Sequence, residues 1–214
     1  AATYEFYRDG TAERQVSLTQ LEEAAPASLS AFHIGSLAVT GGDDAPAYEA
    51  FHKACHAQGL LTSYDPNVRP SLTPDRDGFI ARMERTTTHT TVLKLSDEDL
   101  HWLYPDMTEG DAFDRLAKLS QAPVVVLTKG PEGAMGRAGD VRVRVPAAPV
   151  DPLVDTVGAG DTFMATLIRQ VAERAGDFSF DAPALETLLA TASKAAAINC
   201  TRAGCQPPTL AELA

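Results

Sequence analysis

The stretch that decides the fold is Asp155–Asp161, with the sequence Asp-Thr-Val-Gly-Ala-Gly-Asp, which runs directly into the apolar helical pattern of residues 162–168. The small residues Gly158–Gly160 allow consecutive backbone N–H groups to converge on one point. Where such a turn opens a helix, these donors and the positive end of the helix dipole form an anion site. Asp161 stands at the edge of that site, where a carboxylate repels a bound anion unless it has a proton to accept. A phosphate site beside a base is what phosphoryl transfer to a hydroxyl group requires.

A purely structural turn is the alternative, because a short Gly-x-Gly turn before a helix is common in proteins without any ligand. Two features make this turn more particular. Aspartates flank it on both sides, and it lacks the Gly-Lys-Ser/Thr ending of a P-loop. The sequence therefore favours a phosphate site that differs from the P-loop type.

Strand-like apolar runs alternate with amphipathic helices along most of the chain. This alternation predicts an α/β fold with a mostly parallel sheet that is covered by helices on both faces. We predict strands at Ala31–Ile34, Leu60–Tyr64, Thr91–Leu95 and Val124–Thr128, a hairpin of Ala134–Arg137 and Val141–Val145, and helices at Ala45–Gln58, Pro74–Arg85, Asp111–Ser120, Asp161–Arg174 and Ala182–Ile198. In the first residues, Thr3–Tyr7 and Gln15–Leu18 are typical of two further short strands.

Three unusual loops follow predicted strands: Asp65–Pro70, Ser96–Asp99 and Thr128–Gly133. Taken singly, each is explained by a turn or by a helix cap, and Ser96 is a good N-cap for a helix with an acidic first turn. In parallel α/β folds, ligands bind beyond the carboxyl ends of the strands, where these three loops are expected. Their joint occurrence there favours one shared site.

The composition limits the possible partners. The 214 residues suffice for one large domain, and the net charge of −11 argues against nucleic acid or an anionic membrane as the main partner. No apolar run is long enough to span a membrane. Cys55, Cys200 and Cys205 lack the spacing of metal ligands, which predicts reduced thiols and a cytoplasmic location.

The motif at residues 155–161 resembles the C-terminal signature of the ribokinase-like (PfkB) carbohydrate kinases, Asp-Thr-x-Gly-Ala-Gly-Asp. Three loops resemble further motifs of the family in the same order. Asp65–Pro70 is similar to its Asp-x-Asn-x-Arg segment, Thr128–Gly133 to its nucleotide loop, and Asn199–Pro208 to its Thr-Arg-x-Gly-Ala-x-Pro loop, with Cys205 in place of alanine. The resemblance covers essentially the whole chain. It implies a ribokinase-like sheet flanked by helices, with an antiparallel hairpin and a β lid.

The resemblance implies ATP-dependent phosphorylation of a sugar hydroxyl. Asp161 would be the base, and the amides of Gly158, Ala159 and Gly160 would form the anion hole. The residues expected to border the nucleotide are Thr128, Gly130, Gly133 and Arg69.

Two cation sites are also implied by the resemblance. Residues 94–99 lie where many members carry Asn-x-x-Glu, so that Asp99 would approach magnesium through water, although Ser96 replaces the amide and the acid is shortened. A monovalent cation such as potassium would be held by Asp155, Val157, Asn199 and Gly204.

The start of the chain departs from the family pattern. Nothing in residues 1–34 resembles the Gly-rich, Asn-containing sugar site, whereas residues 4–12 resemble the lid hairpin that normally comes later. We therefore expect an N-terminally shortened member that lacks the first strands of the sheet. Residues 1–18 would be a remnant of the lid strands, and residues 19–214 the α/β kinase core that carries the nucleotide site.

The spacing around Lys94–Tyr104 and Cys200–Pro208 looks most like that of bacterial fructokinases. A 2-keto-3-deoxygluconate kinase is the nearest alternative, and a catalytically incomplete nucleotide-binding fragment is an alternative of a different class. The expected partner is a small sugar, without nucleic acid or membrane. The resemblance also implies a homodimer, because lid hairpins in this family often meet across a dimer.

Other candidate sites are explained better by packing. His52 and His56 stand four residues apart, as a metal pair on a helix would, but no glutamate lies between them in the zincin pattern, and surface packing is the favoured interpretation. Trp102 and Tyr104 are expected to pack against the sheet rather than stack on adenine. Cys200 and Cys205 are interpreted as small loop residues rather than a redox pair.

Overall fold

The computed structural model describes residues 6–8 and 10–213. Its centre is a six-stranded sheet in the order β1-β2-β3-β4-β5-β6, in which β1 to β4 pair in parallel and the β4–β5 and β5–β6 pairs are antiparallel. The strands are Ala31–Gly35 (β1), Leu61–Asp65 (β2), Val92–Ser96 (β3), Val124–Thr128 (β4), Ala134–Ala138 (β5) and Val141–Val145 (β6). The mostly parallel sheet and the terminal hairpin are confirmed.

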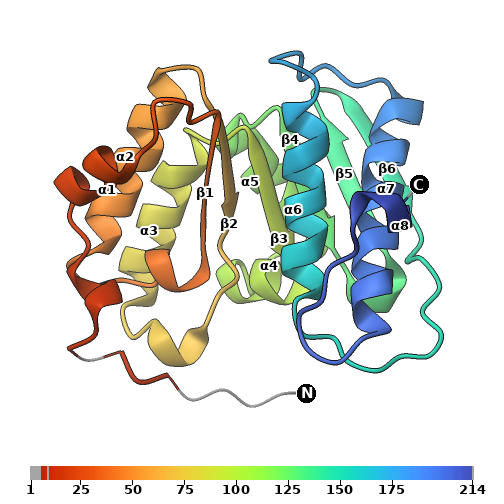
Figure 1. The fold of residues 1–214 in the computed structure, drawn as a ribbon, viewed down its shortest axis with the longest axis horizontal. Coiled ribbons are helices and arrows are strands. Elements are labelled where there is room, and N and C mark those ends of the chain that lie inside the picture. The colour runs from red at the N-terminus through yellow and green to blue at the C-terminus, as the bar shows by residue number, and fades with distance from the viewer. Residues whose placement is uncertain (1–5, 9, 214) are drawn as a thin grey trace.

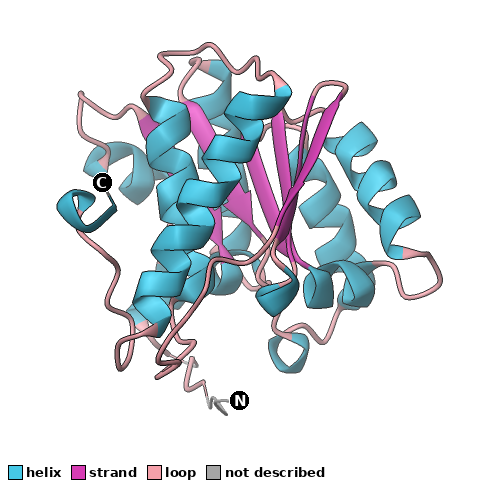
Figure 2. Ribbon diagram, turned by 90° about the vertical axis from the view of Figure 1, so that its right-hand side faces the viewer, coloured by secondary structure: helices cyan, strands magenta, loops and turns pink. Residues whose placement is uncertain are grey.

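Helices cover both faces of the sheet, as Figures 1 and 2 show. One face carries α6 and α7, and the other carries α2, α3, α4 and α5. The helices are Leu18–Ala24 (α1), Ala45–Ala57 (α2), Arg76–Thr87 (α3), Asp97–Leu103 (α4), Glu109–Ser120 (α5), Ala159–Ala172 (α6), Ala182–Cys200 (α7) and Leu210–Leu213 (α8). Short 3₁₀ helices lie at Ala12–Gln15, Ser36–Val39, Pro70–Leu72 and Gly130–Glu132. None of the helices in the described ranges is both long and apolar enough to span a bilayer.

Alternating side chains divide the core into two apolar clusters. In β4, Val124 and Val126 face α6 and α7, whereas Val125 and Leu127 face the helices on the other side. This is the period of two that a strand imposes on its side chains. Each fully buried aliphatic or aromatic side chain contributes roughly 1.5–3 kcal/mol, so that both clusters hold the sheet between its helical layers.

The predicted strand at Gln15–Leu18 is wrong. Gln15 ends a 3₁₀ helix, and Leu18 begins α1. A capping box explains the helix, because the Ser17 side chain accepts from the backbone N–H of Gln20 and the Gln20 side chain accepts from that of Ser17. Most of the other early strand, Thr3–Tyr7, lies outside the described residues, and Phe6 and Tyr7 are not in a strand. The assignment of residues 1–18 to a lid stays a prediction.

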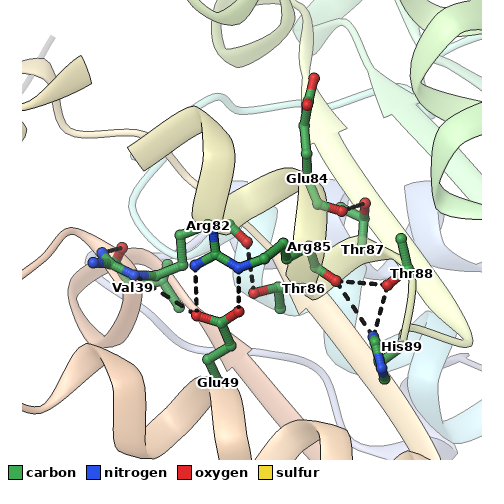
Figure 3. A network of polar contacts seen from close by, with 9 residues as sticks. All are labelled: Val39, Glu49, Arg82, Glu84, Arg85, Thr86, Thr87, Thr88 and His89. Carbon is green, nitrogen blue, oxygen red and sulfur yellow. Dashed lines mark hydrogen bonds and ion pairs between the residues drawn. The ribbon is translucent and has the colours of Figure 1, made fainter. Parts of the chain in front are cut away.

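A polar network joins α2 to α3 on the outer side of the molecule (Figure 3). The Arg85 guanidinium donates to both carboxylate oxygens of Glu49, at 2.9 and 3.1 Å, and the Arg82 side chain donates to the carbonyl of Val39. The Arg85 side chain is 60% exposed, and exposed ion pairs of this kind contribute about 1 kcal/mol at most. The network therefore orients the two helices, while the apolar core beneath them supplies most of the stability.

His52 is fully buried on α2, which corrects the interpretation of surface packing. Its ring lies against Phe32, and both of its nitrogens are buried without a hydrogen-bond partner among the described residues. Burial lowers the pKa of His52 to about 4, and nearby His56 opposes its protonation further. His52 is therefore a neutral core residue. In the described ranges no cluster of three or more His, Cys, Asp and Glu side chains could hold a metal ion.

Candidate active site

Loops from four strands meet at one edge of the sheet. The parallel register pairs Gly35 with Asp65 and Ser96 with Thr128, so that β1 to β4 all end on the same side. The first turn of α6 lies near this edge (Figure 1), and a side chain added at Gly160 would lie 3.7 Å from the Nζ of Lys94, the middle residue of β3. The motifs that follow the predicted strands are thus brought to one side of the molecule, at the edge where α/β folds bind ligands.

The helix α6 begins with an open set of backbone donors. Gly158 precedes it in the left-handed conformation with φ +78°, and a Cβ at this position would collide with the Cys205 Sγ. The amide of Ala159 donates to the carbonyl of Thr156 at 3.2 Å, so that it closes the turn. The next amides, of Gly160 and Asp161, have no acceptor within the helix because an α-helix leaves its first N–H groups unpaired. Together with the dipole, they give this end of α6 the character of an anion site.

Asp161 lies in the first turn of α6 with an exposed side chain. Its neighbour Thr162 is buried, and the Thr162 amide donates to the carbonyl of Gly158 at 2.8 Å, which fixes the helix directly behind the carboxylate. The carboxylate therefore stands at the mouth of the anion site on a rigid element. This is the geometry in which a base can reach a hydroxyl group that approaches a bound phosphate.

Asp155 joins the loop before α6 to the loop after α7. One carboxylate oxygen accepts from the amide of Val157 at 3.1 Å, and the other accepts from the amide of Gly204 at 2.9 Å. These backbone donors lower the pKa of the Asp155 carboxyl, because they favour its charged form. The ionised side chain thus ties two segments that are far apart in sequence.

Asn199 completes this connection from the end of α7. Its side chain is fully buried, donates to the carbonyl of Val157 at 2.8 Å and accepts from the amide of Gln206 at 2.8 Å. Hydrogen bonds therefore join the four residues expected to hold a monovalent cation, which are Asp155, Val157, Asn199 and Gly204. Both Asp155 oxygens and the Val157 carbonyl already accept hydrogen bonds within this group, and their binding of a monovalent cation stays a prediction.

Asp99 has a different environment from the one expected of a magnesium ligand. Its Oδ1 accepts from the amide of Val68 at 2.7 Å, and its Oδ2 accepts from the amide of Ser96 at 3.0 Å. The Ser96 side chain accepts in turn from the Asp99 amide, which makes a reciprocal cap for α4. Because both of its oxygens accept from backbone amides, Asp99 clamps the loop after β2 to α4, and its approach to magnesium through water stays a prediction.

The predicted nucleotide loop follows β4. The Thr128 hydroxyl donates to the carbonyl of Leu95 at 3.2 Å. Gly130 and Gly133 both have positive φ, and a Cβ at Gly133 would collide with the carbonyl of Val145. The amide of Lys129 donates to the carbonyl of Gly133 at 2.8 Å and closes the loop. The glycines are thus required by a tight turn at the edge that also holds the start of α6.

Arg69 lies in the loop after β2, with its guanidinium folded back on that loop. One terminal nitrogen donates to the side-chain oxygen of Asn67 at 2.6 Å and to the carbonyls of Asn67 and Val68 at 3.1 Å. Asn67 adopts a positive φ of 40°, which brings its groups within reach of the arginine. A role of Arg69 at the phosphates would require this side chain to turn out of its loop.

Sequence reasoning missed a buried ion pair at the same edge. The Lys94 ammonium donates to the Asp65 carboxylate at 2.7 Å, and both side chains are almost completely buried between the sheet and α6. The signal was present in the run Val-Leu-Lys-Leu of β3, where a charge interrupts an apolar strand. Such a charge is costly unless it is paired, and its partner on β2 cannot be read from the local pattern.

Four parallel strands, a glycine turn that opens a helix at their carboxyl edge, and a carboxylate in the first turn are features of α/β proteins that bind a phosphate group at a helix N-terminus. A model of the family described as "pfkB family carbohydrate kinase" matches residues 2–212. The chain belongs to this family, which confirms the resemblance drawn from its motifs.

Curated relatives of the chain include fructokinases from bacteria and plants. The fructokinase of Rhizobium leguminosarum bv. trifolii is 37% identical over 167 residues, which cover 78% of this chain and 50% of the relative. Fructokinase-2 of Zea mays is 32% identical over 212 residues, which cover 96% of this chain and 62% of the relative. The chain thus spans about half to two thirds of the length of these proteins.

Solved structures share the fold. A fructokinase from Xylella fastidiosa with bound ATP superposes with a TM-score of 0.87 at 24% identity, over 99% of this chain and 68% of that one. A fructokinase double mutant from Vibrio cholerae O395, in its fructose-, ADP- and potassium-bound form, gives a TM-score of 0.78 at 24% identity, over 92% of this chain and 63% of that one. The ribokinase-like α/β fold is therefore confirmed.

Proposed function

We propose that the protein transfers the γ-phosphoryl group of ATP to a hydroxyl group of a sugar, with D-fructose as the leading acceptor. The observation that carries this proposal is the exposed Asp161 carboxylate at the open N-terminus of α6. A site that only binds an anion gains nothing from a carboxylate at this position, because the two negative charges repel each other. The fructokinase relatives support the choice of acceptor.

Asp161 would accept the proton of the attacking hydroxyl, and the first-turn amides of α6 would stabilise the charge on the transferring phosphoryl group. The two effects act together, since each is aimed at a charge that develops only in the transition state. Because the amide of Ala159 already donates to the carbonyl of Thr156, we assign the larger part of the anion hole to the amide of Gly160, with Gly158 at the N-cap beside it. Thr128, Gly130 and Gly133 would border the nucleotide from the end of β4.

Cations enter the proposal in different ways. Potassium would be held by the hydrogen-bonded residues around Asp155. Its positive charge would favour the binding of nucleotide phosphates near the loop that opens α6. Magnesium would arrive bound to the phosphates of ATP, because Asp99 is engaged as a clamp. A homodimer and a cytoplasmic location stay predictions of the sequence.

The test is a coupled assay of ADP formation with magnesium and potassium, against D-fructose and 2-keto-3-deoxygluconate. We expect sugar-dependent turnover that falls by ~10²–10⁴ in Asp161→Asn, the range that general-base assistance supplies. The matched control is Asp140→Asn, because Asp140 is exposed in the β5–β6 turn at the opposite edge of the sheet. Equal turnover in Asp161→Asn and in the control would reject the base assignment. Turnover with 2-keto-3-deoxygluconate alone would reassign the acceptor.

A further inference from the structure

The Asp65–Lys94 pair interrupts an otherwise apolar face of the sheet. Leu61 and Val92 belong to the cluster under α6 and α7, and Asp65 and Lys94 follow at even spacing on the same two strands, so that they point to the same face. The neighbouring residues on the opposite face, Tyr64 before Asp65 and Leu95 after Lys94, are buried and belong to the other apolar cluster. Among the described residues of β2 and β3, the buried charges thus lie on the face beneath the start of α6.

Stability alone does not account for this pair. A buried ion pair is often no more stabilising than two apolar side chains of similar volume, because both charges lose their hydration. Asp65 Oδ1 adds to the cost, since it is buried without a hydrogen-bond partner among the described residues. An acceptor that is buried without a partner destabilises the folded state, because it loses its hydration without compensation. A residue pair with these costs is expected where the charge has a use.

The position of the ammonium indicates that use. A Cβ at Gly160 would lie 3.7 Å from the Lys94 Nζ, which places the charge directly beside the loop that opens α6. An ammonium has three donors, and Asp65 accepts from it through one oxygen at 2.7 Å. The ammonium thus lies beside Gly160, whose amide is unpaired, and the two groups would act together on a phosphate.

We propose that Lys94 binds the phosphate groups of ATP together with the first turn of α6, and that Asp65 is the positioning residue that holds the ammonium beneath this loop. The inference rests on the proposed function for the identity of the anion, but not for the acceptor sugar. Asp65 also keeps the local charge balanced when no phosphate is bound, which lets the site bury a lysine between the sheet and the helix.

Calorimetric titration of ATP and of adenosine tests the proposal, because only ATP carries the phosphates. In Lys94→Met we expect about tenfold weaker ATP binding and unchanged adenosine binding, relative to Lys118→Met, which removes an exposed lysine on the other side of the sheet. Lys94→Met is expected to fold, because burial already raises the pKa of Asp65 and the lone carboxyl can take up a proton. The double variant Asp65→Asn/Lys94→Met carries neither charge and provides a second folded background.

The positioning role of Asp65 predicts coupling between the two residues. Asp65→Asn should weaken ATP binding when Lys94 is present and have no further effect in the Lys94→Met background. Equal effects in both backgrounds would overturn the positioning role. A parallel loss of ATP and adenosine affinity in Lys94→Met would show that the pair is only structural.

The same variants separate this inference from the proposed function. Selective loss of ATP affinity in Lys94→Met, in a protein that phosphorylates no sugar, would support the inference and reject the kinase. If Lys94→Met changes neither the sugar-dependent turnover nor the ATP affinity, the kinase is supported and the role of Lys94 is rejected. A chain that binds neither ATP nor adenosine would overturn both.

Discussion

The two faces of the sheet differ most at the edge where the parallel strands end. On the face covered by α3, α4 and α5, apolar side chains continue almost to the last residue of each strand, with Tyr64, Leu95 and Leu127 all buried. On the face covered by α6, the apolar cluster gives way at the same level to Asp65 and Lys94. At this edge the same strands therefore carry apolar side chains on one face and a buried ion pair on the other.

The two faces therefore place different demands on the sequence, apolar packing on one and a matched pair of charges on the other. Apolar side chains are interchangeable within limits of volume, whereas buried charges need a defined partner. Substitutions on the α3–α5 face are thus expected to change stability with little effect on ATP binding. Substitutions at the start of α6 should do the reverse.

The largest effect on stability is expected from Phe113→Ala in α5, since this side chain is completely buried in the cluster with Leu93 and Leu127. Loss of the ring should lower the free energy of unfolding by about 3–5 kcal/mol. Urea unfolding measures the change, with Lys118→Ala on the exposed side of the same helix as the control. A decrease in the free energy of unfolding below about 1 kcal/mol, or a loss of ATP affinity in the folded protein, would contradict the difference between the two faces.

The next effect concerns pH and His52. Because its pKa is about 4 in the folded protein and about 6.5 in the unfolded chain, the unfolded chain binds the proton more readily between these values. The contribution of neutral His52 to the free energy of unfolding is therefore complete above pH 6.5. It is lost as the pH falls, and the loss amounts to about 3 kcal/mol at pH 4. His52→Leu removes this titration, so that its unfolding free energy should fall less between pH 7 and 4. An identical pH dependence in both proteins would contradict the assignment.

The smallest effect on stability is expected at Gly158, where the consequence for binding should be larger. Gly158→Ala forces a side chain into a left-handed conformation at a cost of about 1–2 kcal/mol and into the Cys205 Sγ. The loop should shift and ATP affinity should fall, with partial recovery in Gly158→Ala/Cys205→Ala. Gly139→Ala is the control, because Gly139 also has a positive φ but has open space around it. Equal ATP affinities in Gly158→Ala and Gly139→Ala would show that the α6 loop tolerates displacement.

Local patterns predicted the features that local chemistry determines. The β-branched run at Val124–Val126 became a central strand, and Ser96 caps α4 as expected. At Gln15–Leu18 a short polar–apolar alternation suggested a strand, but the reciprocal cap of Ser17 and Gln20 favours a helix. The wrong prediction arose because a four-residue alternation is weaker than a satisfied helix terminus.

Features that depend on pairing between distant segments could not be predicted from the residues alone. The burial of His52 depends on how α2 packs against β1, and the Asp65–Lys94 pair depends on the neighbouring positions of β2 and β3. The family resemblance placed Asp99 near magnesium, but nothing in the sequence indicated that the amide of Val68, from a different loop, donates to one of its oxygens. In each of these cases a partner that is remote in sequence determined the chemistry.

The hydrogen bonds of Asp155 to the amides of Val157 and Gly204 also have a practical consequence for protein engineering. They fix the start of α6 to the segment after α7, so that the connection between these helices, residues 173–181, lies at the far end of both. The 14 residues of α6 place that connection about 20 Å from the anion loop. A fluorophore, an affinity tag or an inserted reporter domain attached there would move with the helical hairpin and report on it, while the end proposed to bind phosphate stays untouched.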